Sequence, residues 1–140
     1  MDISTVICSL LKWIQQLTFE SKFPDVIGIF MFDNAPCHRK FPDDGLNALA
    51  MNVRPGGKQP RMRGTVWNGQ VQTMTLADGT PKGLKLVLQE RGVNCKDLNA
   101  ESMRGILSKH NDFVQQKTLL EERVEARGHT CICLFSEISL

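Results

Sequence analysis

The fold depends most on an apolar stretch near the start of the chain, Val26-Ile27-Gly28-Ile29-Phe30-Met31-Phe32. Pro24 lies just before this run, and Asp33 follows it directly. The run is rich in β-branched and aromatic residues and shows no alternation with polar ones. Residues 26–33 are therefore predicted to form a strand that is buried on both faces, ending at Asp33.

Helical patterns and a second apolar run surround this strand. Apolar residues recur at helical spacing before Pro24, which predicts a helix within residues 1–22. The pattern over residues 81–127 predicts several helices, and the last of them is a continuous helix over 113–127. The apolar run over residues 129–135 predicts a second strand. The expected architecture is α/β, with two neighbouring parallel strands flanked by helices.

An irregular segment with one hairpin separates the two halves of this pattern. Residues 34–80 contain many Pro and Gly residues, which interrupt any period. Within them, Asn68-Gly69 lies between two short apolar-polar runs and suits the positive φ values of a type I′ hairpin turn. Trp67, beside this turn, could stack on a nucleic-acid base or pack on the neighbouring strand.

Length and composition limit the classes of protein to consider. The chain has 140 residues, enough for one modest domain, and its net charge of +2 is too small to identify a nucleic-acid binder. Five cysteines without a Cys-x-x-Cys pair suggest reduced thiols rather than a disulfide framework. Because no apolar run approaches about 20 residues, we expect no membrane span and a nuclear or cytoplasmic protein.

Basic residues gather in one part of the irregular segment. Residues 51–63 contain four cations and no acid; the cations are Arg54, Lys58, Arg61 and Arg63. On a flexible Gly/Pro-rich loop, these side chains could contact phosphates without reading base sequence. A solvated loop without a partner is the other interpretation, and charge alone does not separate the two.

Asp33 is the first candidate for a metal ligand. Ligands of parallel sheets collect at the carboxyl ends of the strands, where Asp33 is expected, and a carboxylate there suits Mg²⁺ or Mn²⁺. The alternative is that Asp33 only forms an Asx-turn where the strand ends.

A resemblance favours the metal-binding interpretation. Phe32-Asp33-Asn34-Ala35-Pro36-Cys37-His38 resembles the second-aspartate motif of DDE-type transposases. The similarity continues through the Pro55-Gly56-Gly57-Lys58, Thr65–Gly69, Asp78–Leu84 and Leu88–Val93 stretches. Over about residues 24–134 the chain is similar to a DDE-superfamily endonuclease domain, mariner-type and RNase H-like, of transposon-derived proteins.

The resemblance implies a partial RNase H-like fold over residues 1–140 and metal-dependent cleavage or strand transfer of DNA. It assigns Asp33 as a catalytic, metal-binding carboxylate for Mg²⁺ or Mn²⁺, with Asn34 and His38 in support. It also assigns DNA contacts to the basic loop. Two-metal phosphodiester chemistry needs several carboxylates, and a DDE family supplies three.

The chain departs from the family pattern around the other two carboxylates. No strand-borne aspartate precedes Asp33, and the segment after the last strand offers only Glu137, which we interpret as a tail residue. We therefore expect a fragment of the family domain that does not cleave DNA. The alternatives are a non-catalytic module that binds DNA or protein through residues 54–63, and an incomplete chain whose exposed sheet edges favour self-association.

A thiol-metal site is a further alternative. His129, Cys131 and Cys133 fall on one face of a strand, and Cys37 and His38 could complete a zinc site if the two strands are neighbours. Cysteines in a central strand are more often small buried hydrophobic residues.

Overall fold

The computed structural model describes the backbone of residues 3–134, and the side chains from residue 10 onward within that range. The chain divides into two compact units. The first unit contains the residues up to Lys40 together with those from Lys117 on, and the second unit is Phe41–Gln116.

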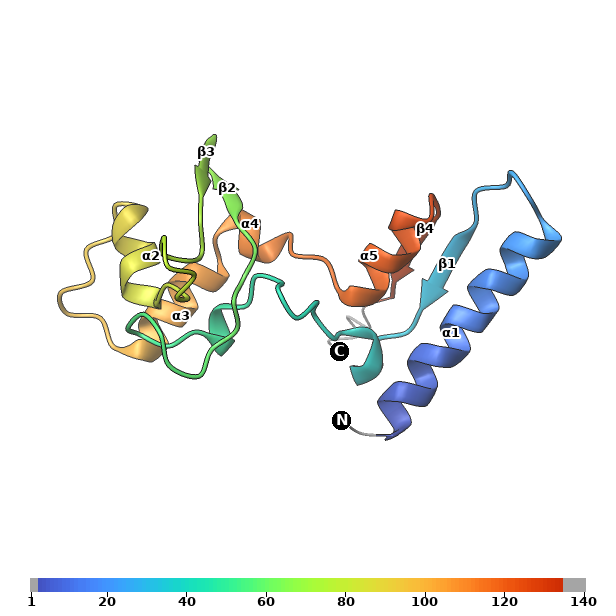
Figure 1. The fold of residues 1–140 in the computed structure, drawn as a ribbon, viewed down its shortest axis with the longest axis horizontal. Coiled ribbons are helices and arrows are strands. Elements are labelled where there is room, and N and C mark those ends of the chain that lie inside the picture. Colours follow the sequence, from blue (N-terminus) through green and yellow to red (C-terminus); the bar gives the residue numbers. More distant parts are fainter. Residues whose placement is uncertain (1–2, 135–140) are drawn as a thin grey trace, which may run out of the picture. The chain divides into compact units, whose positions relative to one another are not determined.

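The first unit is built around a two-stranded parallel sheet (Figure 1). Its elements in chain order are α1 (Ile3–Lys22), β1 (Ile29–Phe32), the 3-10 helix η1 (Pro36–His38), α5 (Leu119–Ala126) and β4 (Thr130–Cys133). The prediction of a mixed α/β protein with two adjacent parallel strands is confirmed.

One face of this sheet is covered by helices. Phe30 and Phe32 are half-buried and line a pocket together with residues of α1 and α5. Ile29 and Met31 point the other way, and they are 66% and 65% exposed. The prediction of a strand over 26–33 buried on both faces is therefore wrong. Because α1 and α5 both pack on the Phe30 face, no described element covers the opposite one.

A polar cluster ties the end of α1 to the starts of both strands. Glu20 pairs with Arg127 and accepts a hydrogen bond from Nε2 of His129 at 3.0 Å. The Nδ1 atom of the same imidazole accepts the backbone N–H of Gly28 at 3.0 Å. The hydrogen bonds from Arg127 and then from His129 lower the pKa of Glu20 to about 2. Both imidazole nitrogens of His129 therefore help to hold the amino ends of β1 and β4 together.

The second unit has a larger hydrophobic core. Its elements are η2 (Ala48–Ala50), the antiparallel hairpin β2 (Thr65–Trp67) and β3 (Gln70–Gln72), α2 (Leu84–Glu90), α3 (Ala100–Ser108) and α4 (Asn111–Val114). The buried side chains include Met51, Met62, Met74, Leu84, Val87, Leu88, Met103 and Leu107. The predicted hairpin is confirmed, and its turn residues Asn68 and Gly69 have φ values of 47° and 77°, as a type I′ turn requires.

The single helix predicted over residues 113–127 is wrong, because the structure divides it into α4 and α5. Thr118 caps α5 in a capping box: its hydroxyl accepts the N–H of Glu121, and the Glu121 carboxylate accepts the N–H of Thr118. Before the break, the Gln116 side chain accepts the N–H of Leu46 at 2.9 Å. The two Thr118–Glu121 hydrogen bonds satisfy backbone N–H groups at the start of α5, so a new helix begins there.

Arg91, just after α2, is the centre of a buried polar network in the second unit. Its guanidinium forms two hydrogen bonds with Asp112, at 2.9 and 2.7 Å, and the two side chains are 1% and 8% exposed. It also donates to Oε1 of Gln72 at 2.8 Å. Gln72 donates in turn to Glu90, which pairs with Lys82. The network joins the hairpin to α2 and α4.

We predict that Arg91→Met will lower the free energy of unfolding of the second unit by about 3–5 kcal/mol, because it leaves Asp112 charged, buried and without its main partner. Urea unfolding followed by Trp67 fluorescence, in a Trp13→Phe background, measures this loss. The control is Lys109→Met, an exposed position in the same unit, with an expected change within about 0.5 kcal/mol. Equal losses in the two variants would contradict a stabilising role of the network.

Candidate functional site

The predicted site residues Asp33, Asn34 and His38 come together in one tight turn at the carboxyl end of β1. The Oδ1 atom of Asp33 accepts the backbone N–H of Ala35 at 3.1 Å, which is an Asx-turn. The Nδ1 atom of His38 lies 2.7 Å from the Asp33 carbonyl oxygen and 2.8 Å from Oδ1 of the same residue. Because a carbonyl oxygen only accepts, Nδ1 carries the proton and donates to Asp33.

The two partners in this contact differ in their exposure. The side chain of Asp33 is 78% exposed, whereas that of His38 is 10% exposed. The imidazole packs edge-on against the Phe32 ring, with ring centroids 5.4 Å apart. His38 therefore acts as a buried support that orients the backbone and carboxylate of Asp33. The third residue of the turn, Asn34, has a buried Oδ1 atom without a hydrogen-bond partner within the described part of the chain.

The turn provides one carboxylate toward a metal site. The Asp33 side chain is largely exposed, so its carboxylate could bind a divalent cation from the solvent side. Within residues 10–134, no three His, Cys, Asp or Glu side chains gather closely enough to hold an ion. Glu137, the remaining sequence candidate, lies outside the described residues. At this turn the described residues offer the Asp33 carboxylate, whereas two-metal chemistry requires several carboxylates.

The thiol-metal alternative does not fit the described geometry. His129 already uses Nδ1 for the N–H of Gly28 and Nε2 for Glu20. Burial, with a contribution from the neighbouring Cys133, raises the pKa of the Cys131 thiol to about 12. Burial also raises the pKa of Cys133. Because both His129 nitrogens are already hydrogen-bonded, the described geometry offers zinc no free imidazole nitrogen on this strand.

The basic loop of residues 51–63 is held by its own side chains. The Gln59 amide donates to the carbonyl of Gly56 at 2.7 Å and accepts the N–H of Asn52 at 3.0 Å. The carbonyl of Asn52 in turn accepts the N–H of Leu84, the first residue of α2. Although its composition suggested a flexible segment, the loop is thus fastened to the amino end of a core helix.

This loop presents three of its four cations to solvent. Arg54, Lys58 and Arg61 are exposed. Arg63 is half-buried and pairs with Asp44 at 2.6 Å, and this bond lowers the pKa of Asp44. The structure therefore separates a structural arginine from three exposed positive charges, a distinction that the sequence did not provide.

Trp67 packs on residues outside its hairpin. Its indole stacks on the His110 ring, with centroids 4.2 Å apart and planes 13° apart, and the Arg91 guanidinium lies 4.6 Å from the indole centroid. Nδ1 of His110 lies 2.9 Å from Nη1 of Arg91, and must accept, because arginine only donates. The sequence contains no local signal for this stack, because the two rings are 43 positions apart, at 67 and 110.

No described helix is long and apolar enough to cross a membrane. No protein-family model, no curated protein and no solved structure matches this chain.

The Trp67–His110 stack leads to a pH-dependence prediction. Burial, and then the Arg91 charge, lower the pKa of His110 below its usual value of about 6.5. Between pH 7.5 and 5.5 the unfolded chain therefore takes up a proton at His110 that the folded chain resists, which destabilises the fold as the pH falls. We expect the melting-temperature advantage of the wild type over His110→Gln to shrink across this range. An advantage that stays constant or grows as the pH falls would contradict the lowered pKa of His110. His38 and His129 are present in both proteins, so their contributions cancel in the comparison.

Proposed function

We propose that the chain derives from a DDE-type nuclease domain of RNase H-like fold, and that Asp33 corresponds to one metal-binding carboxylate of such a domain. The observation that carries the proposal is the position of Asp33, exposed at the carboxyl end of a strand that is paired in parallel with β4. The motif resemblance around Asp33 and the His38 support of its carboxylate agree with this assignment. Mg²⁺ or Mn²⁺ would be the metal by analogy with the family.

In this proposal the chain does not cleave DNA by itself. An in-line phosphodiester displacement with two metal ions needs several carboxylates to hold the ions and to balance their charge. Asp33 supplies one, and its Oδ1 is already occupied by the Ala35 N–H and His38. Binding to DNA is compatible with a location in the nucleus or the cytoplasm.

We expect the purified chain to leave supercoiled plasmid intact in the presence of either Mg²⁺ or Mn²⁺. Gel electrophoresis of the plasmid measures nicking, and Asp33→Asn is the matched variant, since it keeps the Asx-turn acceptor while removing the charge. Metal-dependent nicking that Asp33→Asn abolishes would show that the carboxylate set is complete and would overturn this part of the proposal.

A second candidate function is DNA binding through the basic loop, independent of any metal. The favouring observation is that Arg54, Lys58 and Arg61 are exposed on a backbone held by Asn52 and Gln59. A preorganised loop loses less conformational entropy on binding than a flexible one. Contacts of this kind address phosphates rather than bases, so binding is expected to be independent of sequence and sensitive to salt.

We predict that Arg54→Ala with Lys58→Ala weakens binding to a 30-base-pair duplex and lowers the slope of log K against log salt by up to about 1.8, or about 0.9 for each phosphate contact. The matched control is Lys96→Ala with Lys109→Ala, which also removes two exposed charges from the second unit. Fluorescence anisotropy over a salt series measures both doubles. Equal losses in the two, or binding indifferent to salt, would exclude the loop as the interface.

A further inference from the structure

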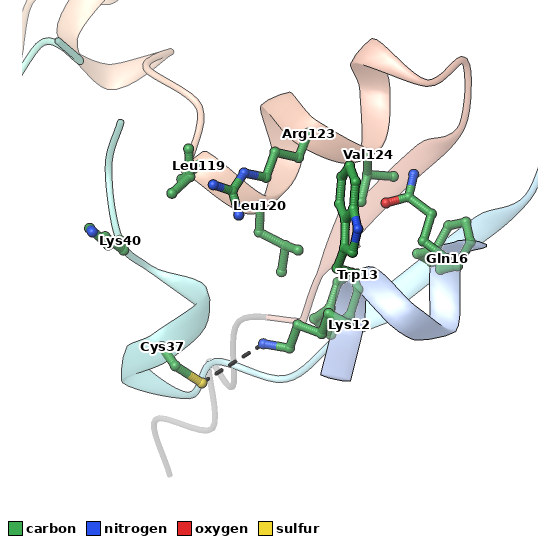
Figure 2. Close-up of a pocket in the computed structure, with 11 residues that line it drawn as sticks. Lys12, Trp13, Gln16, Cys37, Lys40, Leu119, Leu120, Arg123 and Val124 are labelled. Carbon is green, nitrogen blue, oxygen red and sulfur yellow. Dashed lines mark hydrogen bonds between the residues drawn. The ribbon is translucent and has the colours of Figure 1, made fainter. Parts of the chain in front are cut away.

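The first unit contains a pocket that neither the Asp33 turn nor the basic loop uses. It lies between α1, β1, α5 and the segment around η1 (Figure 2). Its walls include the rings of Trp13, Phe30 and Phe32 together with Leu120 and Val124. These apolar groups come from three elements that are far apart in the sequence, so only the packing of the unit creates the pocket.

The charged groups that line this pocket are all positive. Lys12 comes from α1, Arg123 from α5, and Lys40 from the segment after η1. No acidic side chain lines the pocket, and no ion pair links these three cations to any other described residue. Lys12 instead lies 3.8 Å from the Cys37 sulfur and 5.4 Å from the Phe32 ring centroid. Three cations that have no ion-pair partner among the described residues favour an anionic ligand in this pocket.

A buried amide in the same wall lacks a partner. Gln16 is 4% exposed and lies beside Trp13 in the wall of the pocket (Figure 2). Its Nε2 is buried and has no hydrogen-bond partner in the described part of the chain. Buried polar groups are normally paired, so this amide is an unsatisfied polar position in the pocket wall.

We propose that this pocket binds a small anion that carries a planar aromatic ring, of the nucleoside-monophosphate class. The ring packs against Trp13 and the neighbouring phenyl groups, and the phosphate is met by Lys12, Lys40 and Arg123. The cavity volume is only about 40 Å³, too small to enclose an aromatic ring with its phosphate, so the ring lies across the mouth of the pocket rather than inside it.

The test uses AMP, adenosine and inorganic phosphate, each titrated into the ¹⁵N-labelled full chain. Two indole N–H signals serve as reporters, because Trp13 lines the pocket and Trp67 lies in the second unit. We expect AMP to shift the Trp13 signal and leave the Trp67 signal in place. We expect AMP to bind more tightly than adenosine, which lacks the anion, and than phosphate, which lacks the ring.

Charge variants test which residues hold the anion. Lys40→Gln with Arg123→Gln removes two exposed pocket cations and is expected to weaken AMP binding by about fivefold, as two exposed charge contacts would, while leaving adenosine unchanged. The matched control, Lys22→Gln with Arg39→Gln, removes two exposed cations of the same unit outside the pocket and should leave both affinities unchanged.

Two results would overturn the proposal: AMP binding no tighter than phosphate, or equal weakening in the pocket and control doubles. A pentameric single-stranded oligoadenylate separates the two sources of such a ligand. Tighter binding of the pentamer than of AMP, through the same Trp13 shift, assigns the ligand to a nucleic-acid strand, and tighter binding of AMP assigns it to a free nucleotide. Because the basic-loop double leaves the pocket intact, failure of DNA binding there and failure of AMP binding here are distinguishable.

Discussion

The parallel pairing of β1 with β4 is the constraint on which the first unit depends. The paired residues, from Ile29 opposite Thr130 to Phe32 opposite Cys133, lie about a hundred positions apart in the chain. The backbone N–H of Thr130 bonds to the Gly28 carbonyl at 2.9 Å, and that of Leu134 to the Phe32 carbonyl at 2.8 Å. The Glu20–His129 contact reinforces one end. These bonds must offset the conformational entropy that is lost when the long loop between the two strands closes. Because the second unit has its own core, most of this loop is ordered independently, and the effective loop is shorter.

The two units stabilise themselves by different means. The second unit has a contiguous core of methionine and aliphatic side chains and a buried network centred on Arg91. Among the described residues of the first unit, Val124 is the one large hydrophobic side chain that is buried. On α1, Leu11 and Ile14 are more than half exposed. The apolar face with Ile29 and Met31 also lacks a cover among the described elements. Self-association through exposed sheet edges stays a prediction.

The candidate sites differ in how far they follow from local sequence. Asp33 and His38 are five positions apart, so their contact depends on one strand end and the turn that follows it. The separation of Arg63 from the exposed Arg54 and Lys58 depends on Asp44 and could not be predicted from charge. The pocket beside Trp13 could not be predicted either, since its cations come from positions 12, 40 and 123 and acquire a common function only through helix packing.

The sequence by itself determined the elements whose signals are local: the apolar β1 run and the Asn68-Gly69 turn. The Thr118–Glu121 capping box was also present in the sequence, but helical periodicity over 113–127 obscured it. Only the tertiary structure decided which sheet face is covered, where Trp67 stacks and which cations stay unpaired. These features depend on contacts between distant segments, and periodicity carries no information about which segments meet.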